Sequence, residues 1–382
     1  MKKRILIDAT TVIEKKDGLS QYIISILYSL PAAAFDEFHF MVFINKGVKR
    51  KELWDVIGNG KFEIIEAKIA PIGPRRDLDL FLFFRKFRDK FDLFHSTSNQ
   101  YPLFLKNGIA TVHDITFKKY LNSNWWTFNM ASRYLNLVIN RSIKNAAAVI
   151  AVSEFTRQDL IQHYQLNDTM QKKIKVIYEG WEHLINNLVD TGSELMPEFE
   201  HYLFYVGNTR LHKNMKNLLR AFNIAAEQLP PGIKLVISGD EGFLDEGDKK
   251  LIKEINRSGE RIVFTGFVSK AALEHLFRNA DAFIFPSLYE GFGIPVLESF
   301  YFKKPLLCSD ITSLPEIAGD AALYFDPEIP ENIAAVIIYF FKNRDIEKIL
   351  IAKGVERLKL FSWKKASAET VDLYRAVLNK TS

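Results

Sequence analysis

The stretch at residues 282–299 constrains the fold more than any other part of the chain. It opens with the apolar run Ala282–Phe285, which indicates a buried parallel strand and is ended by a proline. Gly291 and Gly293 follow, and a second proline stands where the first turn of a helix is expected. We therefore predict a strand, a glycine-bearing loop and a helix N-terminus with Glu298 in its first turn. Ligands of open α/β sheets bind beyond the carboxyl ends of the strands, and a helix N-terminus suits a phosphate.

Two carboxylates, Glu290 and Glu298, bound this loop with seven residues between them. Each alone is equally consistent with a solvated loop acid or with an acid that complements the helix dipole. The whole string Glu-Gly-Phe-Gly-Ile-Pro-Val-Leu-Glu, however, resembles the E-x7-E signature of retaining glycosyltransferases with the GT-B fold, especially glycosyltransferase family 4 (glycosyl transferases group 1). The resemblance implies that Glu290 contacts the donor sugar and that Glu298 holds the nucleotide ribose. It also implies that the intervening backbone meets the diphosphate and sugar, at Gly291, Phe292, Gly293 and Ile294.

Strand-like apolar runs alternate with helical patterns along all 382 residues, which is typical of doubly wound parallel sheets. The length suits about two domains, and a chain that is 48% hydrophobic and 25% charged is ordinary for a globular α/β protein. With the resemblance, this predicts an α/β protein of GT-B type, in which two Rossmann-like domains face an interdomain cleft. We expect an acceptor-side domain at 1–190, a nucleotide-sugar domain at 191–362 and a last helix, 363–382, that crosses back onto the first domain.

Positive charge is concentrated in the first half of the chain. Residues 1–190 carry 27 Lys and Arg against 20 Asp and Glu, whereas the remainder carries 24 against 26. This asymmetry fits either an ordinary solvated surface or an anionic partner, such as a membrane surface or a lipid-phosphate acceptor. The sequence shows no signal-peptide pattern and no apolar run of 18 residues, and its single cysteine, Cys308, lies in an apolar run. We expect a cytoplasmic protein, with peripheral binding to the inner face of the membrane as an open alternative.

The segment 75–91 predicts a basic aromatic helix. Four large apolar side chains share one of its faces: Leu80, Phe84, Phe87 and Phe91. Such a helix either packs on a sheet or lies on a membrane, and the sequence leaves both open. Asp77 and Asp79 have the spacing of an Asp-x-Asp metal motif, but they fall inside this helix instead of at a strand end. We therefore predict no metal site there.

The first domain supplies two candidate site residues. Gly18 precedes a predicted helix at about 19–30, where the missing side chain allows a ligand to approach the backbone. The family resembled here often has two adjacent glycines at this place, whereas this chain has Asp17 and Gly18. His113 closes a predicted strand, and a lone histidine in such a place is usually structural. Its segment Thr-Val-His-Asp-Ile-Thr nevertheless resembles a recurring family 4 segment, which implies that His113 lies beside the donor sugar and the reaction centre.

The second domain supplies a cationic turn after the predicted strand 201–206. A glycine followed by Arg210 and Lys213 forms a chemically sensible site for a diphosphate. Members of the family usually carry arginine directly after this glycine, where this chain has Asn208. Lys213 matches the family lysine, and whether Arg210 replaces the missing arginine stays open. Phe267 follows another predicted strand, and its segment resembles the one that contacts the nucleotide base through the backbone.

The resulting hypothesis is a retaining, metal-independent glycosyltransferase that moves a sugar from a nucleotide-diphosphate donor to a hydroxyl of a glycan or lipid-linked glycan. We expect His113, Glu290 and Lys213 to be catalytic, with Lys213 and the helix N-terminus stabilising the leaving phosphate. No His, Asp or Cys cluster has metal-ligand spacing, so no metal or other cofactor is expected. The resemblance favours mannose from GDP-mannose and a role in bacterial surface polysaccharide (lipopolysaccharide) biosynthesis.

Two rival hypotheses remain open at the level of sequence. One is another GT-B enzyme, such as a nucleotide-sugar epimerase or a phosphorylase. The other is a non-enzymatic protein that binds anionic surfaces through its basic first half. Nucleic acid is not expected as a partner, because the charge is diffuse and no recognition motif is present.

Overall fold

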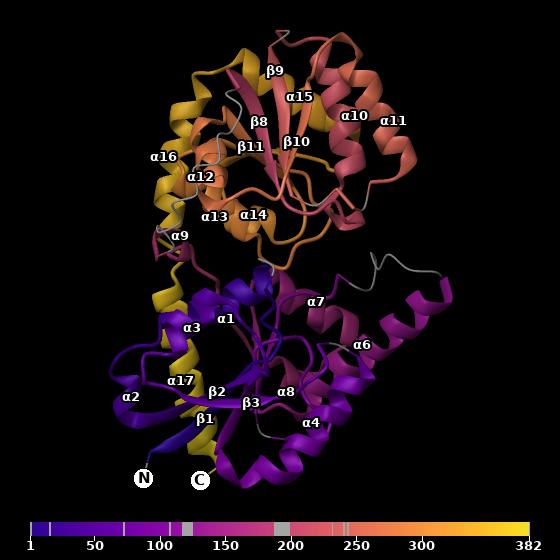
Figure 1. Cartoon of the computed structure of the whole chain (residues 1–382). Helices are drawn as coiled ribbons and strands as arrows, with labels where there is room; N and C mark the ends of the chain where they lie inside the picture. The colour runs from indigo at the N-terminus through magenta and orange to yellow at the C-terminus, as the bar shows by residue number, and fades with distance from the viewer. Residues whose placement is uncertain are drawn as a thin grey trace. The chain divides into compact units, whose positions relative to one another are not determined.

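The computed structural model describes residues 2–14, 17–71, 73–106, 108–116, 125–186, 199–230, 232–239, 241–242 and 244–381. The chain divides into two compact units (Figure 1). The first unit comprises residues 1–183 together with 362–382, and the second comprises 184–361. The sequence also predicts a linker at 185–198, which contains Asn186, Gly192 and Pro197, and most of it lies outside the described residues. Each unit contains one parallel sheet with helices, which confirms the predicted doubly wound α/β architecture.

The sheet of the first unit has the order β3-β2-β1-β4-β5-β6-β7, with neighbouring strands parallel. Its strands are β1 (Lys3–Ala9), β2 (Phe38–Asn45), β3 (Glu63–Ala67), β4 (Leu93–Ser96), β5 (Ile109–Val112), β6 (Ala148–Ala151) and β7 (Ile174–Val176). The helices are α1 (Gly18–Tyr28), α2 (Ala34–Glu37), α3 (Lys51–Ile57), α4 (Pro74–Phe87), α6 (Trp125–Asn145), α7 (Glu154–Tyr164), α8 (Asp168–Gln171) and α17 (Trp363–Thr381). The chain direction across the sheet reverses between β1 and β4, which places the topological switch point there.

The last helix, α17, belongs to the first unit, where it packs against α1. Glu182 caps its start: one carboxylate oxygen accepts the backbone N–H of Trp363 at 2.7 Å, and the other accepts the hydroxyl of Ser362. Further along the helix, the hydroxyl of Tyr374 lies 2.7 Å from Nδ1 of the buried His95 in β4. The first unit is therefore completed by residues that follow the whole second unit in the chain.

Helix α4 packs on the sheet through part of the predicted face, since Leu80 and Phe84 are buried. Its solvent side is not purely polar, however. Leu78, Phe81 and Leu82 form an exposed apolar stripe with helical spacing. The two acids of the Asp-x-Asp pattern lie within α4, where Asp79 pairs with Arg75. Among the described residues, no helix has the length and apolar character needed to span a bilayer.

The sheet of the second unit has the order β10-β9-β8-β11-β12-β13 and is also parallel. Its strands are β8 (His201–Val206), β9 (Ile233–Ser238), β10 (Ile262–Gly266), β11 (Ala282–Phe285), β12 (Leu306–Ser309) and β13 (Ala322–Phe325). Its helices are α10 (Met215–Ala226), α11 (Glu246–Ile255), α12 (Lys270–Asn279), α13 (Ile294–Tyr301), α14 (Leu314–Ala318), α15 (Pro330–Lys342) and α16 (Ile346–Leu358), while the short α9 (His183–Asn186) lies at the boundary between the units. Figure 1 shows α10, α11 and α15 on one side of this sheet and α12, α13 and α16 on the other.

The strand β11 predicted at 282–285 is confirmed residue for residue, and it is buried throughout. It lies beside β8 at the centre of the sheet, so the switch point of the second unit falls between these two strands. Cys308 is buried in the neighbouring β12, as its apolar surroundings predict. The loops after β8 and β11 therefore flank the position at which open α/β sheets bind ligands.

The buried His95 generates a prediction about acid stability. Burial, with a smaller contribution from the nearby His113, lowers the pKa of His95 to about 3. Because an unfolded histidine titrates near pH 6.5, the unfolded chain binds one more proton than the folded chain between these values. The stability of the first unit should therefore fall as the pH drops from about 6.5 towards 3, by up to about 1.4 kcal/mol per pH unit from this group.

Urea unfolding monitored by tryptophan fluorescence tests this prediction, since all five tryptophans of the chain lie in the first unit. The variant His95→Asn, which cannot titrate in this range, should show a shallower loss of stability on acidification than the wild type. Equal slopes for the two proteins would contradict the assignment of a neutral His95 to the folded state.

Candidate active site

The carboxyl edge of the second sheet is lined by glycine. Gly207 and Gly239 directly follow β8 and β9, and Gly266 ends β10. The Gly207 N–H donates to Ser238 O, and the Gly239 N–H donates to Gly266 O, both at 2.9 Å. A Cβ atom on Gly239, whose φ is 140°, would lie only 1.9 Å from the Gly207 carbonyl oxygen. The turns therefore need glycine, and they leave an edge of bare backbone.

Lys213 and Glu290 meet at this edge, as the sequence resemblance implies for two residues that bind one donor. Lys213 ends a short 3-10 turn (Leu211–Lys213), and its Nζ lies 2.6 Å from Glu290 Oε1. Both side chains are largely buried, and the ammonium group lies 5.3 Å from the centre of the Phe285 ring. The site thus holds a shielded cation whose carboxylate partner comes from the loop after β11.

Asn214 joins three loops of this edge. It adopts the left-handed conformation with φ of 60°, which asparagine tolerates better than most residues. Its side-chain amide donates to Pro286 O at 3.0 Å and to Pro327 O at 2.7 Å. The loops after β8, β11 and β13 are therefore held together by one buried side chain. Asn214 is not among the residues predicted from the sequence, although its place directly before the start of α10 was an available signal.

The predicted loop and helix start are present around Gly293. Its φ is 104°, and a Cβ atom there would lie 2.9 Å from a methyl carbon of Leu314, so the position requires glycine. The hydroxyl of Ser313 lies 3.0 Å from Glu290 O and 2.9 Å from Phe292 O, which fixes the loop from the following turn.

One detail of this prediction was wrong, because Glu298 is not in the first turn of the helix. Helix α13 begins at Ile294, so Glu298 is its fifth residue and lies in the second turn. The left-handed Gly293 and the proline at 295 set the start of the helix at Ile294. A start nearer to Glu298 would be needed to place this residue in the first turn. Its carboxylate therefore lies outside the first turn, the part of the helix whose dipole favours a negative charge.

The remaining donor-side candidates lie on loops at the same edge. The carbonyl oxygen of Asn208 accepts the hydroxyl of Tyr205 at 2.8 Å, and its side-chain oxygen accepts the Arg210 N–H at 3.2 Å. Burial, with the charge of Glu290, keeps the pKa of Tyr205 above its ordinary value, so its hydroxyl remains a donor. Arg210 is exposed, and the ring of Phe267 is 70% exposed beyond β10. Asn208 therefore shapes the turn after β8 on which Arg210 is exposed, while Phe267 is exposed on the separate loop after β10.

In the first unit, His113 directly follows β5. Its Nε2 lies 3.0 Å from Thr97 O, and its Nδ1 lies 3.3 Å from a carboxylate oxygen of Glu179. The Tyr22 ring meets the histidine ring edge to face, with centroids 4.7 Å apart. Burial favours the neutral ring, but Glu179, the Thr97 carbonyl and Asp114 outweigh it and leave the pKa of His113 above its ordinary value. Glu179 is not among the residues predicted from the sequence, since it lies 66 residues from His113 in the chain.

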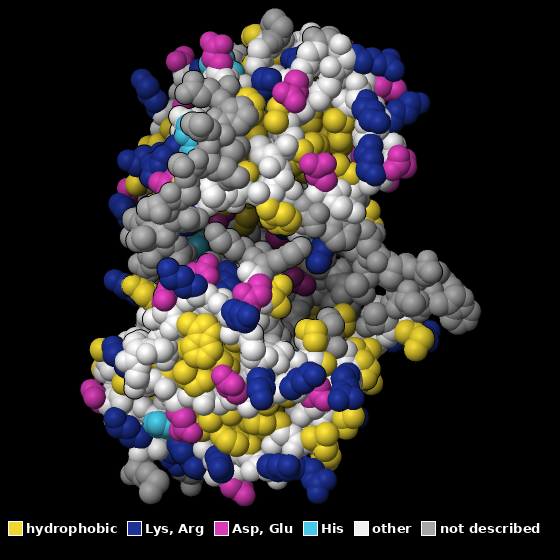
Figure 2. Space-filling model, viewed as in Figure 1, with side chains coloured by type: hydrophobic (Ala, Val, Ile, Leu, Met, Phe, Trp, Pro, Cys, Tyr) yellow, Lys and Arg dark blue, Asp and Glu magenta, His cyan; other side chains and the backbone are white. Residues whose placement is uncertain are grey.

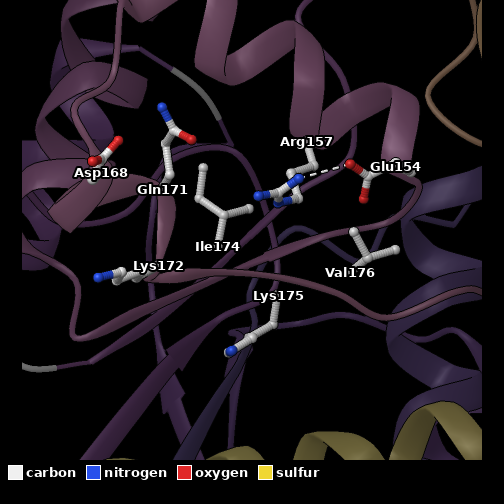
Figure 3. A pocket seen from close by; sticks show the side chains of 8 residues that line it. All are labelled: Glu154, Arg157, Asp168, Gln171, Lys172, Ile174, Lys175 and Val176. Atoms are coloured by element: carbon white, nitrogen blue, oxygen red, sulfur yellow. Dashed lines mark hydrogen bonds and ion pairs between the residues drawn. The ribbon is translucent and has the colours of Figure 1, made fainter.

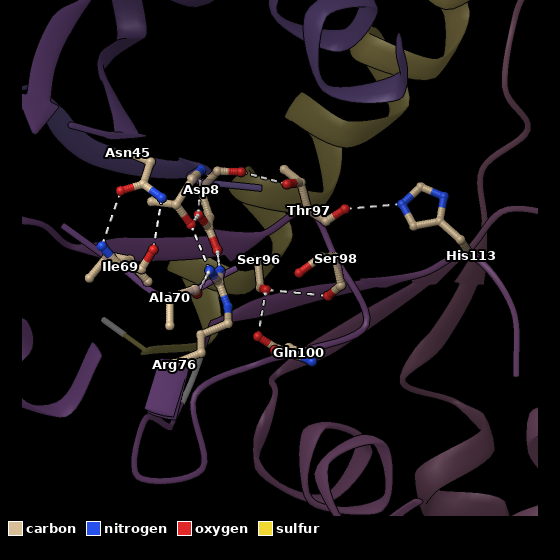
Figure 4. Close-up of polar contacts among 11 residues, drawn as sticks. Asp8, Asn45, Ile69, Ala70, Arg76, Ser96, Thr97, Ser98, Gln100 and His113 are labelled. Atoms are coloured by element: carbon tan, nitrogen blue, oxygen red, sulfur yellow. Dashed lines mark hydrogen bonds and ion pairs between the residues drawn. The ribbon is translucent and has the colours of Figure 1, made fainter. Parts of the chain in front are cut away.

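A buried ion pair lies at the neighbouring strand ends (Figure 4). Arg76, from the start of α4, donates to Asp8 Oδ2 at 2.6 Å and to the Thr10 hydroxyl at 2.9 Å. Asp8 Oδ1 in turn accepts the backbone N–H of Thr10. Figure 4 shows this cluster and His113 on either side of Thr97, whose hydroxyl donates to Asp8 O. The pair fixes the loop after β1, which leads towards Gly18.

Gly18 is the first residue of α1, and the helix is capped by Asp17, whose carboxylate accepts the Ser20 N–H at 2.6 Å. A Cβ atom on Gly18 would have no atom within 4 Å among the described residues. Packing within the described part of the first unit therefore does not require a glycine at this position. Whether a ligand requires it stays a prediction.

A hollow of the described surface lies elsewhere in the first unit (Figure 3). It has a volume of about 540 Å³ and follows the edge strand β7 and helices α7 and α8. Arg157, Lys172 and Lys175 line it together with two carboxylates, and Arg157 is paired with Glu154 at 2.7 Å. None of the predicted site residues lines this hollow. Within the described ranges, no three His, Cys, Asp or Glu residues are grouped to hold a metal ion.

The chain matches models of known protein families along most of its length. The model of Glycosyltransferase Family 4 matches residues 19–182, and that of Glycosyl transferases group 1 matches residues 190–357. The O-antigen chain mannosyltransferase B of Escherichia coli is 27% identical over 288 residues, a match that covers 74% of each chain. The O-antigen chain mannosyltransferase RfbU of Salmonella typhimurium is 26% identical over 233 residues, which cover 61% of this chain and 60% of that protein.

Solved structures share the fold along the whole chain. The sucrose-phosphate synthase of Thermosynechococcus elongatus superposes with a TM-score of 0.73 at 18% identity, covering 99% of this chain and all of that one. WaaG, a glycosyltransferase involved in lipopolysaccharide biosynthesis, gives a TM-score of 0.70 at 14% identity and covers 97% and 99% of the two chains. The two family matches follow one another along most of the sequence, and the chain is a glycosyltransferase with the GT-B fold that belongs to glycosyltransferase family 4, the glycosyl transferases group 1.

Proposed function

We propose that this glycosyltransferase moves mannose from GDP-mannose to a hydroxyl of a glycan or lipid-linked glycan, with retention of the anomeric configuration and without a metal ion. The observation that carries the proposal is the Lys213–Glu290 pair at the switch point of the second sheet. The mannosyltransferase relatives support the choice of sugar, and their part in O-antigen synthesis supports bacterial surface polysaccharide as the product.

The donor diphosphate fits the glycine-lined edge after β8 and β11. Lys213 supplies a cation there, and the dipole of α13 adds partial positive charge at the N-terminus of the helix after Gly293. Arg210, exposed on the same turn, is placed to add a second cation. As the bond from C1 of the sugar to the phosphate breaks, negative charge grows on the leaving phosphate, and these groups stabilise it electrostatically. They do what a divalent metal ion does in other transferases.

The roles proposed for the other residues follow from the family resemblance. Glu290 would contact the sugar and Glu298 the ribose, while Phe267 would border the base. In the transfer step, the acceptor oxygen forms the new bond to C1 on the face that the phosphate leaves. The acceptor proton passes to the departing phosphate, so the step needs no protein nucleophile. Gly18 and His113 would serve the sugar from the first unit.

Transfer itself is the first test. With GDP-mannose and an octyl mannoside as acceptor, we expect an α-linked product, and we expect turnover to persist in excess EDTA. Anomeric proton signals report the configuration, and GDP release reports the rate. Turnover that returns only on addition of Mg²⁺ or Mn²⁺ would contradict metal independence. Conversion of GDP-mannose to another sugar nucleotide without acceptor would favour an epimerase instead.

Replacement of Lys213 by alanine tests the diphosphate site. The variant should bind GDP about tenfold to a hundredfold more weakly, because one charge-assisted hydrogen bond is worth roughly 1.5–3 kcal/mol. Guanosine, which lacks the phosphates, should bind almost as before, and calorimetry measures both ligands. Lys216→Ala is the matched control, since this lysine is exposed on the following helix.

Part of any loss in Lys213→Ala can come from the unpaired charge of Glu290. The double variant Lys213→Ala/Glu290→Gln removes that charge and should recover only this part of the affinity for GDP. An equal loss for GDP and guanosine in the single variant would overturn the assignment of Lys213 to the diphosphate.

We also propose that the first unit binds anionic membranes peripherally through α4 and α6, which would bring it to a lipid-linked acceptor. The exposed stripe of Leu78, Phe81 and Leu82 leads into the cations Arg85 and Lys86. Helix α6 contains no Asp or Glu, and its exposed residues include Met130, Leu137 and three cations, Arg133, Arg141 and Lys144. Figure 2 shows yellow and dark-blue side chains intermingled over this part of the surface. Alternating apolar and cationic side chains suit the interface of an anionic bilayer.

Sedimentation with phospholipid vesicles tests membrane binding. We expect the protein to bind vesicles that contain phosphatidylglycerol but not vesicles of phosphatidylcholine alone. Arg85→Ser/Lys86→Ser should weaken binding by about 25-fold, since each cation near the surface contributes about 1 kcal/mol. Lys249→Ser/Lys250→Ser in the second unit removes the same charge as a control. Equal binding to neutral and anionic vesicles would contradict the proposal.

A further inference from the structure

Both ring nitrogens of His113 face oxygen atoms of the first unit. Nε2 lies 3.0 Å from the Thr97 carbonyl oxygen, and Nδ1 lies 3.3 Å from the Glu179 carboxylate. A neutral imidazole has one N–H, so it would turn a nitrogen lone pair towards one of these oxygens. Only the doubly protonated ring donates to both. We propose that Glu179 is a positioning residue that holds His113 in one orientation as an imidazolium, so that His113 serves transfer as a cation and not as a base.

Glu179 is placed for this task by the end of the chain. Its side chain is only 5% exposed, and the next residue, Gly180, lies against the start of α17. A Cβ atom on Gly180 would lie 2.1 Å from the Trp363 nitrogen, so only glycine lets the two segments approach this closely. Glu182 then binds the same nitrogen through its carboxylate. The backbone directly after Glu179 is therefore fixed against the start of α17.

The other titratable groups around His113 either carry negative charge, which favours the imidazolium, or are neutral near pH 7. Asp114 follows it in the chain and adds a second negative charge. Tyr22, from α1, is buried with its pKa well above the ordinary value, so it stays neutral. His95, in β4, has a pKa of about 3 and is also neutral near pH 7. Glu179 is thus the buried carboxylate that directly meets the ring, and an unpaired charge at that depth would be costly.

This inference rests on the proposed function, because it assigns the charge of His113 a part in mannosyl transfer. An imidazolium has no lone pair with which to accept the proton of the acceptor hydroxyl. It offers positive charge to a donor that carries a diphosphate. Since the pKa of His113 is raised, the cation is complete at low pH, and it is lost as the pH rises through that pKa. Transfer should therefore decline on the alkaline side of the same transition.

The test follows His113 directly by NMR in the full chain, with carbon-13 introduced into the histidine rings. The His113 signal is assigned by its absence in His113→Gln. In the wild type it should titrate above an ordinary histidine. In Glu179→Gln the transition should move to lower pH, and the alkaline limb of kcat for GDP-mannose and octyl mannoside should move with it. At a pH between the two transitions, kcat of the variant should be lower than that of the wild type by up to about tenfold. This is the order of magnitude lost with one charge-assisted contact.

Glu63→Gln is the matched control, because it removes the carboxylate of another His–Glu pair, His39 with Glu63 at 2.7 Å, on the exposed edge of the sheet. It should change neither the His113 titration nor kcat. Glu179→Asp, which keeps the charge on a shorter side chain, should retain a raised pKa of His113 in part.

A wild-type His113 that titrates at or below an ordinary histidine would overturn the proposal, as would an unchanged titration in Glu179→Gln. If the titration moved while the kcat profile did not, Glu179 would still hold the charge, but the role of His113 in transfer would be refuted.

Discussion

Parallel pairing is the constraint on which both sites depend. Neighbouring strands of each sheet run in the same direction, so every connection must cross back over the sheet and all carboxyl ends gather at one edge. In the second unit this brings together loops that follow β8, β11 and β13, although Asn214 and Pro327, which meet there, are 113 residues apart in the chain. Asn214 then converts this neighbourhood into a fixed arrangement, because two of the loops place their carbonyl oxygens on its amide.

The Lys213–Glu290 pair shows how a cation at this edge of the sheet is stabilised when no anionic ligand is bound. A largely buried ammonium group is costly without a partner, and here the carboxylate of the opposite loop supplies one at 2.6 Å. A diphosphate that approached the same lysine would compete for its N–H groups with a partner that is already in place. The free energy of binding the phosphate would therefore be a difference between two ion pairs, which favours selectivity for a ligand of the right shape over any simple anion.

The sequence was sufficient for the architecture and for the residues that lie close together in the chain. Glycine and proline around β11 predicted the strand, the loop and the helix start, since each of these residues restricts the backbone locally. The sequence pattern wrongly predicted Glu298 in the first turn of α13 instead of the second. The residue at which this helix begins depends on the left-handed Gly293 and its packing against Leu314. The solvent face of α4 was left undecided, since periodicity showed which side chains share a face but not how wide a stripe stays exposed.

Contacts between distant parts of the chain were beyond a single sequence. Nothing near Glu179 indicates that its partner is His113, and nothing near Asn214 indicates that its amide will reach two prolines. These pairs form because crossovers bring separate strand ends together. A local sequence pattern does not show which distant residues will lie close together in the folded chain. The same holds for His95 and Tyr374, which are separated by 279 residues and meet inside the first unit.

The return of α17 to the first unit also sets the order in which the protein can be finished during synthesis. A ribosome delivers residues 184–361, the entire second unit, before it delivers Trp363 and Tyr374. Until then Glu182 has no helix to cap, and His95 lacks the hydroxyl that meets its ring. The second unit can therefore complete its folding before the first unit gains its last helix. Domains usually complete folding in order from the N-terminus, so the order is reversed here. The unit that contains β1 is therefore the later of the two to be completed.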